Sequence, residues 1–182
     1  MSSPSSATPA TWRPRPAVAL LLGPLYHLTE RDDRLQALAE ARRVVKPGGL
    51  VAAAGISRFA PLLDYGATTG LVEPEIQDRV RERLATGRYP EPATGLRSGF
   101  TVAYYHTSGE LIAEATEAGL AKPVVYGIEG PGWTMVRSVE RYTGELLGGT
   151  PLYAAALAAA RLSDDHPALI DASAHMLCVA QA

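Results

Sequence analysis

Residues 17–57, AVALLLGPLYHLTERDDRLQALAEARRVVKPGGLVAAAGIS, decide the fold of this chain. The run Ala17–Leu22 contains no polar residue, which is typical of a short strand buried on both faces of a parallel sheet. Periodicity alone also allows a buried helix segment. Gly23-Pro24 ends this run. A second apolar run, Leu50–Ile56, closes the stretch and predicts a second strand.

The segment between these two runs has the features of an amphipathic helix. Thr29 and Asp32 have the spacing of a capping box at the start of the helix. Pro47-Gly48-Gly49 marks its end. The apolar face would consist of Leu35, Leu38, Ala41 and Val45. A strand, a crossover helix and a second strand predict a right-handed parallel βαβ unit, and therefore an α/β fold.

Two motifs in this stretch, "GPLYHL" at residues 23–28 and "ARRVVKPGG" at residues 41–49, resemble those of class I S-adenosylmethionine-dependent methyltransferases. In that family the fourth strand ends in a substrate-side loop, followed by a helix, a "KPGG" turn and the fifth strand. Three later segments fit one bacterial branch of small-molecule methyltransferases: "GFTVAYYHTSGELIAEATEAGL", "GIEGPGW" and "SAHMLCVA". The resemblance covers roughly residues 17–182.

This resemblance implies the C-terminal part of a Rossmann-like class I methyltransferase sheet, with parallel strands, an antiparallel last strand and helices on both faces. After the strands at Ala17–Leu22 and Leu50–Ile56, the strand near Val124–Ile128 would be next in line. The antiparallel last strand would lie at residues 172–180. The helical insertion before it would be Met135–Leu147 and Leu152–Leu162.

The implied function is transfer of a methyl group from S-adenosylmethionine to a small-molecule acceptor. In an open α/β sheet, ligands bind beyond the carboxyl ends of the strands. By resemblance, the segment Leu22-Gly23-Pro24-Leu25 would contact the cofactor, and Tyr26 and His27 would lie near the transferred methyl as catalytic residues. The alternative is that Tyr26 and His27 only cap the next helix.

Two later residues are candidates for the substrate pocket. His106 immediately precedes a predicted helix start, and a turn histidine bonded to the backbone is an equal alternative. The "GIEGPGW" segment lacks the lysine of a phosphate-binding loop, so its glycines would instead place Trp133 on a pocket wall. The four histidines and the cysteine show no metal-ligand spacing, so the sequence predicts no metal site.

A helix predicted from Pro74 carries an apolar stripe formed by Ile76, Val80 and Leu84, and Gly87 ends it. Three arginines lie off this stripe: Arg79, Arg81 and Arg83. They could meet an anionic substrate, but a solvated helix face is the favoured interpretation.

The N-terminal segment differs from the rest of the chain. Residues 1–16 are rich in proline, serine and threonine, which predicts a disordered tail before a partial methyltransferase domain at residues 17–182. The family has its glycine-rich cofactor loop and ribose-binding acid at this place. Without them, a non-catalytic remnant or binding module is the alternative function. S-adenosylmethionine binding would be weak, and Ala17–Leu22 would be an exposed edge strand through which the chain could self-associate.

Composition excludes several other classes of protein. The formal net charge of −2 argues against a nucleic-acid partner, which would select for a basic face. No apolar run reaches the roughly 18 residues of a membrane span. The single cysteine, Cys178, cannot form an internal disulfide. These features, and the lack of a clean signal-peptide cleavage site, favour the cytoplasm.

Overall fold

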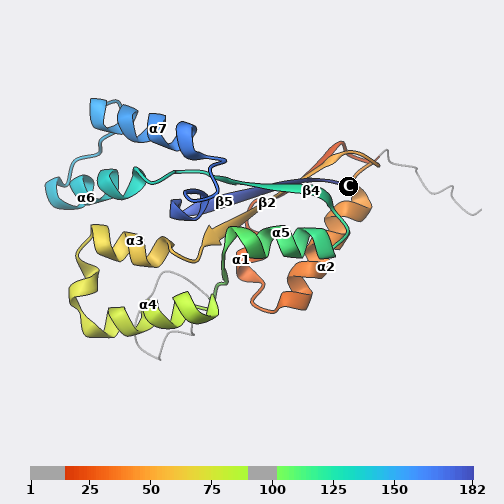
Figure 1. Cartoon of the computed structure of the whole chain (residues 1–182), viewed down its shortest axis with the longest axis horizontal. Helices are drawn as coiled ribbons and strands as arrows, with labels where there is room; N and C mark the ends of the chain where they lie inside the picture. Colours follow the sequence, from red (N-terminus) through yellow and green to blue (C-terminus); the bar gives the residue numbers. More distant parts are fainter. Residues whose placement is uncertain (1–14, 90–101) are drawn as a thin grey trace, which may run out of the picture.

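The computed structural model describes residues 15–89 and 102–182, so residues 1–14 of the predicted tail lie outside the described residues. Within this part of the chain, a five-stranded sheet forms the centre of the fold (Figure 1). Its main path runs β1 (Val18–Leu21), β2 (Leu50–Ser57), β5 (His175–Gln181) and β4 (Ala121–Gly127), and the short β3 (Tyr105–His106) pairs with β2. With helices around a mixed sheet, the α/β class predicted from the sequence is confirmed.

The parallel pairing of the first two strands is also confirmed. β1 pairs with β2 in the register Val18 with Leu50 through Leu21 with Ala53. The single-turn helix α1 (Pro24–His27) and the longer α2 (Arg31–Val44) connect them. This is the predicted strand, helix and strand unit.

The predicted capping box of α2 is wrong. The N-cap residue is Glu30, one position after Thr29, and no side chain caps the helix. Instead, the Arg34 guanidinium donates hydrogen bonds to the carbonyl oxygens of Leu28 and Thr29, both at 3.0 Å. These bonds fix the turn between α1 and α2, so the Thr29 side chain is not needed there. A capping box does occur at α5 (Ser108–Glu117), where Thr107 and Glu110 form it.

The predicted strand order is wrong in one position. β4 was expected beside β2, but β5 lies between them and is antiparallel to both. The predicted antiparallel direction of the last strand is therefore confirmed. The inner position gives β5 a full ladder on each side, and Met176, Cys178 and Ala180 become buried there.

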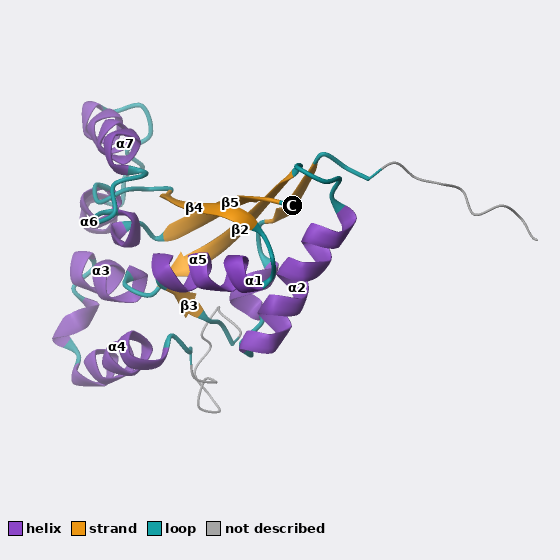
Figure 2. Ribbon diagram, turned by 45° about the vertical axis from the view of Figure 1, so that its right-hand side comes forward, coloured by secondary structure: helices purple, strands orange, loops and turns teal. Residues whose placement is uncertain are grey.

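Helices α2 and α5 cover one face of the sheet and lie side by side (Figures 1 and 2). Between them and the strands lies the main hydrophobic core, which includes Leu21, Leu38, Val51, Leu111, Met176 and Cys178. On the other side of the sheet plane, α7 (Pro151–Ser163) lies near the carboxyl end of the parallel strands (Figure 1). Leu20 and Val124, which lie on this opposite face, are exposed, so the described helices cover mainly the face under α2 and α5.

The expectation that β1 is buried on both faces is wrong. Only the face with Ala19 and Leu21 packs against the main core. Leu20, on the other face, is 64% exposed, and Val18 and the following Leu22 are exposed as well. β1 pairs with β2 alone among the described strands, so it forms an apolar edge of the sheet. Self-association through this edge stays a prediction.

The remaining helices gather beyond the carboxyl end of β2 (Figure 2). They are α3 (Ala60–Ala67), η1 (Gly70–Val72), α4 (Pro74–Thr86), α6 (Trp133–Thr143) and η2 (Ile170–Ala172). α4 begins at Pro74 and is capped by Gly87 as predicted. α6 ends earlier than expected because Gly144 takes a positive φ of 74°. No helix in the described ranges is long and apolar enough to cross a membrane.

Candidate functional site

The loop after β1 lies at the carboxyl end of a parallel strand, as the sequence predicts. Leu22 is exposed, and Pro24 occupies the first turn of α1, where its missing N–H costs nothing. Leu25 is fully buried in the main core and supports the loop from beneath. The Tyr26 hydroxyl lies 3.4 Å from the Leu22 carbonyl oxygen and donates to it.

Tyr26 and His27 lie in different environments. Tyr26 is half-buried and packs against a small apolar cluster that contains Ile56 and Tyr105. Its carbonyl oxygen accepts a hydrogen bond of 2.8 Å from the amide of Tyr104. His27 is exposed, and its ring lies 4.7 Å from the Tyr26 ring. No side-chain capping bond joins either residue to α2.

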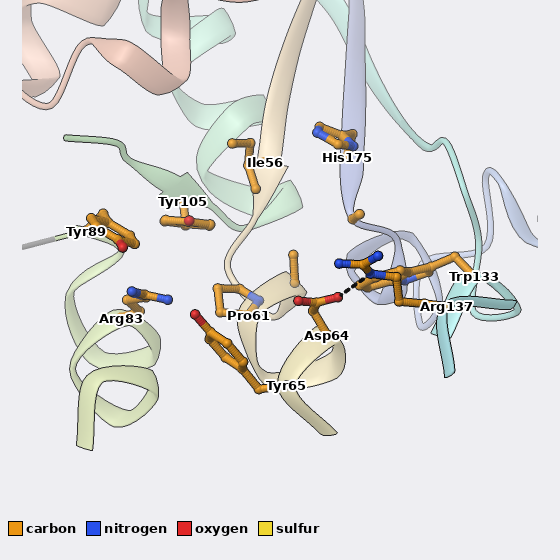
Figure 3. A pocket seen from close by; sticks show the side chains of 12 residues that line it. Ile56, Pro61, Asp64, Tyr65, Arg83, Tyr89, Tyr105, Trp133, Arg137 and His175 are labelled. Carbon is orange, nitrogen blue, oxygen red and sulfur yellow. Dashed lines mark hydrogen bonds and ion pairs between the residues drawn. The ribbon is translucent and has the colours of Figure 1, made fainter. Parts of the chain in front are cut away.

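A pocket of about 600 Å³ opens next to this cluster (Figure 3). Ile56 and Tyr105, two members of the cluster against which Tyr26 packs, also line the pocket, whereas Tyr26 and His27 do not. The other lining residues come from α3, α4 and the segment after it, α6, and the start of β5 with the residue before it: Ala60, Pro61, Asp64, Tyr65, Arg83, Tyr89, Trp133, Arg137, Ala174 and His175. The pocket therefore lies where ligands bind in open α/β sheets.

Aromatic side chains form much of the pocket wall. Tyr89 and Tyr105 stack with ring centroids 6.5 Å apart and an interplanar angle of 27°. Burial raises the pKa of Tyr105, so this phenol stays neutral at physiological pH. Trp133, predicted to line a pocket, does so, and its indole N–H donates to the Ala172 carbonyl oxygen at 2.9 Å. That bond holds the indole plane in place. Trp133 also borders a smaller cavity of about 240 Å³ between α6 and α7.

The charged groups of the pocket differ in how they are paired. Arg137 Nε donates to Asp64 Oδ1 at 3.0 Å, which joins α6 to α3 (Figure 3). His175 Nδ1 lies 2.6 Å from Glu129 Oε1. This hydrogen bond raises the pKa of His175; burial would raise the pKa of Glu129, but the bonds from His175 lower it. Arg83 is only 3% exposed, and no described residue forms a hydrogen bond with its Nε.

The arginines of α4 correct part of the sequence interpretation. Arg79 and Arg81 are exposed, as a solvated face predicts, and Arg81 pairs with Asp78. Arg83 is buried instead. It follows Val80 by three residues and Ile76 by seven, which places it on the apolar stripe. This spacing could have predicted from the sequence that Arg83 is buried. It was not used because an arginine on a helix is usually exposed to solvent.

His106 does not line the pocket. It is fully buried, and its Nε2 lies 3.3 Å from Glu114 Oε2 rather than against the backbone. Arg34 donates to the same carboxylate from Nε at 3.1 and 3.0 Å and from NH2 at 2.7 Å. Burial alone would raise the pKa of Glu114, but the hydrogen bonds from His106 and Arg34 lower it to about 2. This network joins α2, β3 and α5.

A second ion pair lies beside this network. Arg58 NH2 contacts both carboxylate oxygens of Glu110 at 2.7 Å and the Tyr104 hydroxyl at 3.1 Å. Tyr104 lies between two cations, because the Arg34 guanidinium stacks on its ring at 3.7 Å. These contacts fix β3 against β2 and thereby position Tyr105 in the pocket. Within residues 15–89 and 102–182, no group of three or more metal-binding side chains gathers.

Comparisons with known proteins find remote structural likeness without a match in sequence. No protein-family model matches the sequence, and no curated protein matches it. Among solved structures, the chain is similar to a SAM-dependent methyltransferase from Methanosarcina mazei, with a TM-score of 0.47 and 13% sequence identity. The match covers 91% of this chain and 58% of that chain, so this chain spans less than two thirds of that protein's length.

Proposed function

We propose that this chain is an S-adenosylmethionine-dependent methyltransferase, or the acceptor-binding part of one, that acts on a small molecule. The observation that carries the proposal is that the loop after β1 packs against a cluster whose members line the pocket, although no residue of the loop lines the pocket itself. Tyr26 packs on the cluster that includes Ile56 and Tyr105, and both of these line the pocket. A cofactor beside this loop and an acceptor in the pocket would therefore be neighbours.

The loop offers surface suited to one end of the cofactor. Leu22 is exposed, and Gly23 has no side chain to block approach to the backbone. A Cβ atom at Gly23 would meet only the Tyr26 side chain, at 3.4 Å. We propose that this surface holds the methionine part of S-adenosylmethionine. When bound, the cofactor supplies an electrophilic methyl group, so the protein has mainly to hold the acceptor in line and exclude water.

Tyr26 and His27 have separate roles in this proposal. The Tyr26 ring closes the space between the loop and the pocket and orients the acceptor. His27, exposed beside it, accepts the proton of an acceptor that must lose one during attack. With millimolar cofactor and an acceptor that is turned over, Tyr26→Phe and His27→Ala should each lower kcat by more than about twofold. Smaller effects for both variants would remove these two residues from the mechanism.

The cofactor assignment is tested most directly by nuclear magnetic resonance. The 182-residue chain, labelled with ¹⁵N, is titrated with S-adenosylhomocysteine, which is the cofactor after methyl loss. This proposal gives a binding surface only to the methionine end of the ligand. We therefore expect a dissociation constant in the millimolar range, which corresponds to a binding free energy of about −4 kcal/mol. The shifts should be largest at the amides of Leu22, Gly23 and Leu25.

Two glycine variants provide the matched comparison. Gly23→Ala adds one methyl group on the proposed approach and should reduce the shifts of the neighbouring amides. Gly109→Ala makes the same change in α5, where the added Cβ meets only Thr107 Oγ1 at 4.0 Å, and should leave them unchanged. If the amides of residues 22–25 do not move at saturating ligand, or move equally in both variants, the cofactor assignment fails.

A further inference from the structure

The pocket contains a buried cation, Arg83, that has no counter-ion among the described residues. Arg83 is 3% exposed, and among the residues that the structure describes no carboxylate pairs with it. No described residue forms a hydrogen bond with its buried Nε. In Figure 3 the Arg83 side chain points toward Tyr65, Tyr89 and Tyr105 in the pocket. A buried guanidinium with no acceptor is costly, so its position calls for a physical reason.

The aromatic neighbours compensate only part of that cost. The Arg83 Cζ lies 4.0 Å from the ring centroid of Tyr89 and 6.0 Å from that of Tyr105. A ring face attracts the positive charge. It provides no oxygen for the planar fork of N–H donors, which matches the two oxygens of a carboxylate. Within the described part of the chain, the guanidinium thus has aromatic neighbours but no carboxylate, which leaves it able to bind an anion.

The other charges of the pocket are already balanced. Arg137 pairs with Asp64, and His175 pairs with Glu129. One net positive charge, that of Arg83, is left among the described lining residues. A single charge of this kind matches a carboxylate, which carries −1. A phosphate monoester carries about −1.5 to −2 near neutral pH and would leave negative charge buried.

The remaining lining favours a flat ring. Tyr65, Tyr89, Tyr105 and Trp133 surround a space of about 600 Å³, and Ile56 and Pro61 add apolar surface. Ligand pockets of this kind combine apolar and aromatic walls with a few polar groups that set orientation. Arg83 is the polar group in this case.

We infer that the pocket binds an aromatic carboxylate, with its two oxygens on the Arg83 guanidinium and its ring among the tyrosines and Trp133. The inference depends on the proposed function in one respect only, namely that this ligand is the methyl acceptor. The carboxylate would anchor the acceptor at Arg83. The opposite edge of its ring would then face Tyr26.

Binding is measured on the 182-residue chain by calorimetry with two matched probes, benzoate and benzamide. They share the ring and the shape, but only benzoate has a charge. We expect benzoate to bind about tenfold or more tightly than benzamide, as the loss of a charge-assisted hydrogen bond predicts. Equal affinities, or no benzoate binding at about 10 mM, a concentration that gives measurable occupancy even for millimolar ligands, would overturn the inference.

Two arginine variants on the same helix localise the effect. Arg83→Met keeps the length of the side chain without its charge and should remove the preference for benzoate. Arg81→Met removes an arginine that is exposed and paired with Asp78, and it should bind benzoate like the unchanged chain. If Arg83→Met binds benzoate within about twofold of the unchanged chain, a difference below half a kcal/mol, the anion site is not at Arg83.

Thermal unfolding without ligand separates a binding role from a structural one. Removal of an unpaired buried charge should leave the melting temperature of Arg83→Met unchanged or higher. A marked fall would mean that Arg83 stabilises the fold, and would overturn the inference. Failure of the proposed function has a different signature, because benzoate would then bind through Arg83 while S-adenosylhomocysteine leaves the loop amides of residues 22–25 unmoved.

Discussion

Replacement of Glu114 by glutamine should destabilise this chain more than any other single neutralisation of a described carboxylate. Glu114 accepts hydrogen bonds from Arg34, which is 2% exposed, and contacts His106, which is fully buried. Glu114→Gln keeps the size of the side chain but leaves the Arg34 charge buried without its partner. Breaking one side of a buried ion pair costs about 3–5 kcal/mol.

Urea denaturation followed by circular dichroism measures this loss. With a denaturant slope of about 2 kcal/mol/M, the midpoint of Glu114→Gln should fall by about 2 M relative to the unchanged chain. The control is Glu117→Gln, which breaks the exposed pair between Arg31 and Glu117 on the same two helices. Its midpoint should change little, because exposed pairs contribute little.

The double variant Arg34→Met with Glu114→Gln distinguishes charge burial from packing. It removes both charges and still offers His106 an amide oxygen, so it should recover part of the stability lost in Glu114→Gln. Equal midpoints for Glu114→Gln and the unchanged chain would refute the reasoning. A double variant whose loss of unfolding free energy exceeds the sum of the losses in the two single variants would also refute it.

The same carboxylate predicts an acid dependence. The folded-state pKa of Glu114 is lowered to about 2, below the unfolded value of about 4.3. Its contribution is therefore complete above about pH 4.3 and is lost as the pH falls toward the folded value. The unchanged chain should lose stability in this window more steeply than Glu114→Gln, as measured by urea midpoints at several pH values.

Three further predictions concern other parts of the fold. Burial raises the pKa of Cys178 to about 11, so a thiol reagent at pH 8 should react only after unfolding; fast reaction of the folded chain would contradict this. The pKa of His175 is raised by its bond to Glu129, so the charged form is stabilised below about pH 6.5 and that gain is lost as the pH rises through the folded pKa. Proton resonance titration should show a lower His175 pKa in Glu129→Gln, and no change would remove the bond as the cause. Leu20→Lys, on the exposed face of β1, should reduce any self-association seen by sedimentation and any binding of an apolar dye, whereas a dye-silent monomer before the change would refute the edge prediction.

The sequence predicted those parts of the fold that depend on neighbours in the chain. The parallel βαβ unit follows from two apolar runs and the helix between them, and α4 follows from Pro74 and Gly87. The position of β5 could not be read in this way. Its apolar run resembles that of β4, and which of them pairs with β2 depends on contacts between distant segments.

The site was predictable only in part for the same reason. The loop of residues 22–27 and Trp133 were chosen because both follow strands; Trp133 lines the pocket, whereas the role of the loop stays a prediction. Arg83 was missed as a pocket residue because an arginine on a helix is usually solvated, and its burial depends on Tyr89 and Tyr105. His106 was assigned to a pocket because its carboxylate partner, Glu114, becomes visible only when α5 packs against β3.

The inner position of β5 has a consequence for the order of folding. β2 can pair with β1 early, because they are separated by one helix. Its other edge must wait for residues 175–181, since Leu50 pairs with Gln181. During synthesis β2 and β4 therefore each expose an unpaired edge until the final strand emerges, and pairings this distant in sequence are slow to form. A nascent chain stalled before residue 175 would therefore contain β2 with one open edge and β4 without its strand partner, a state that exposes unpaired strand edges to aggregation.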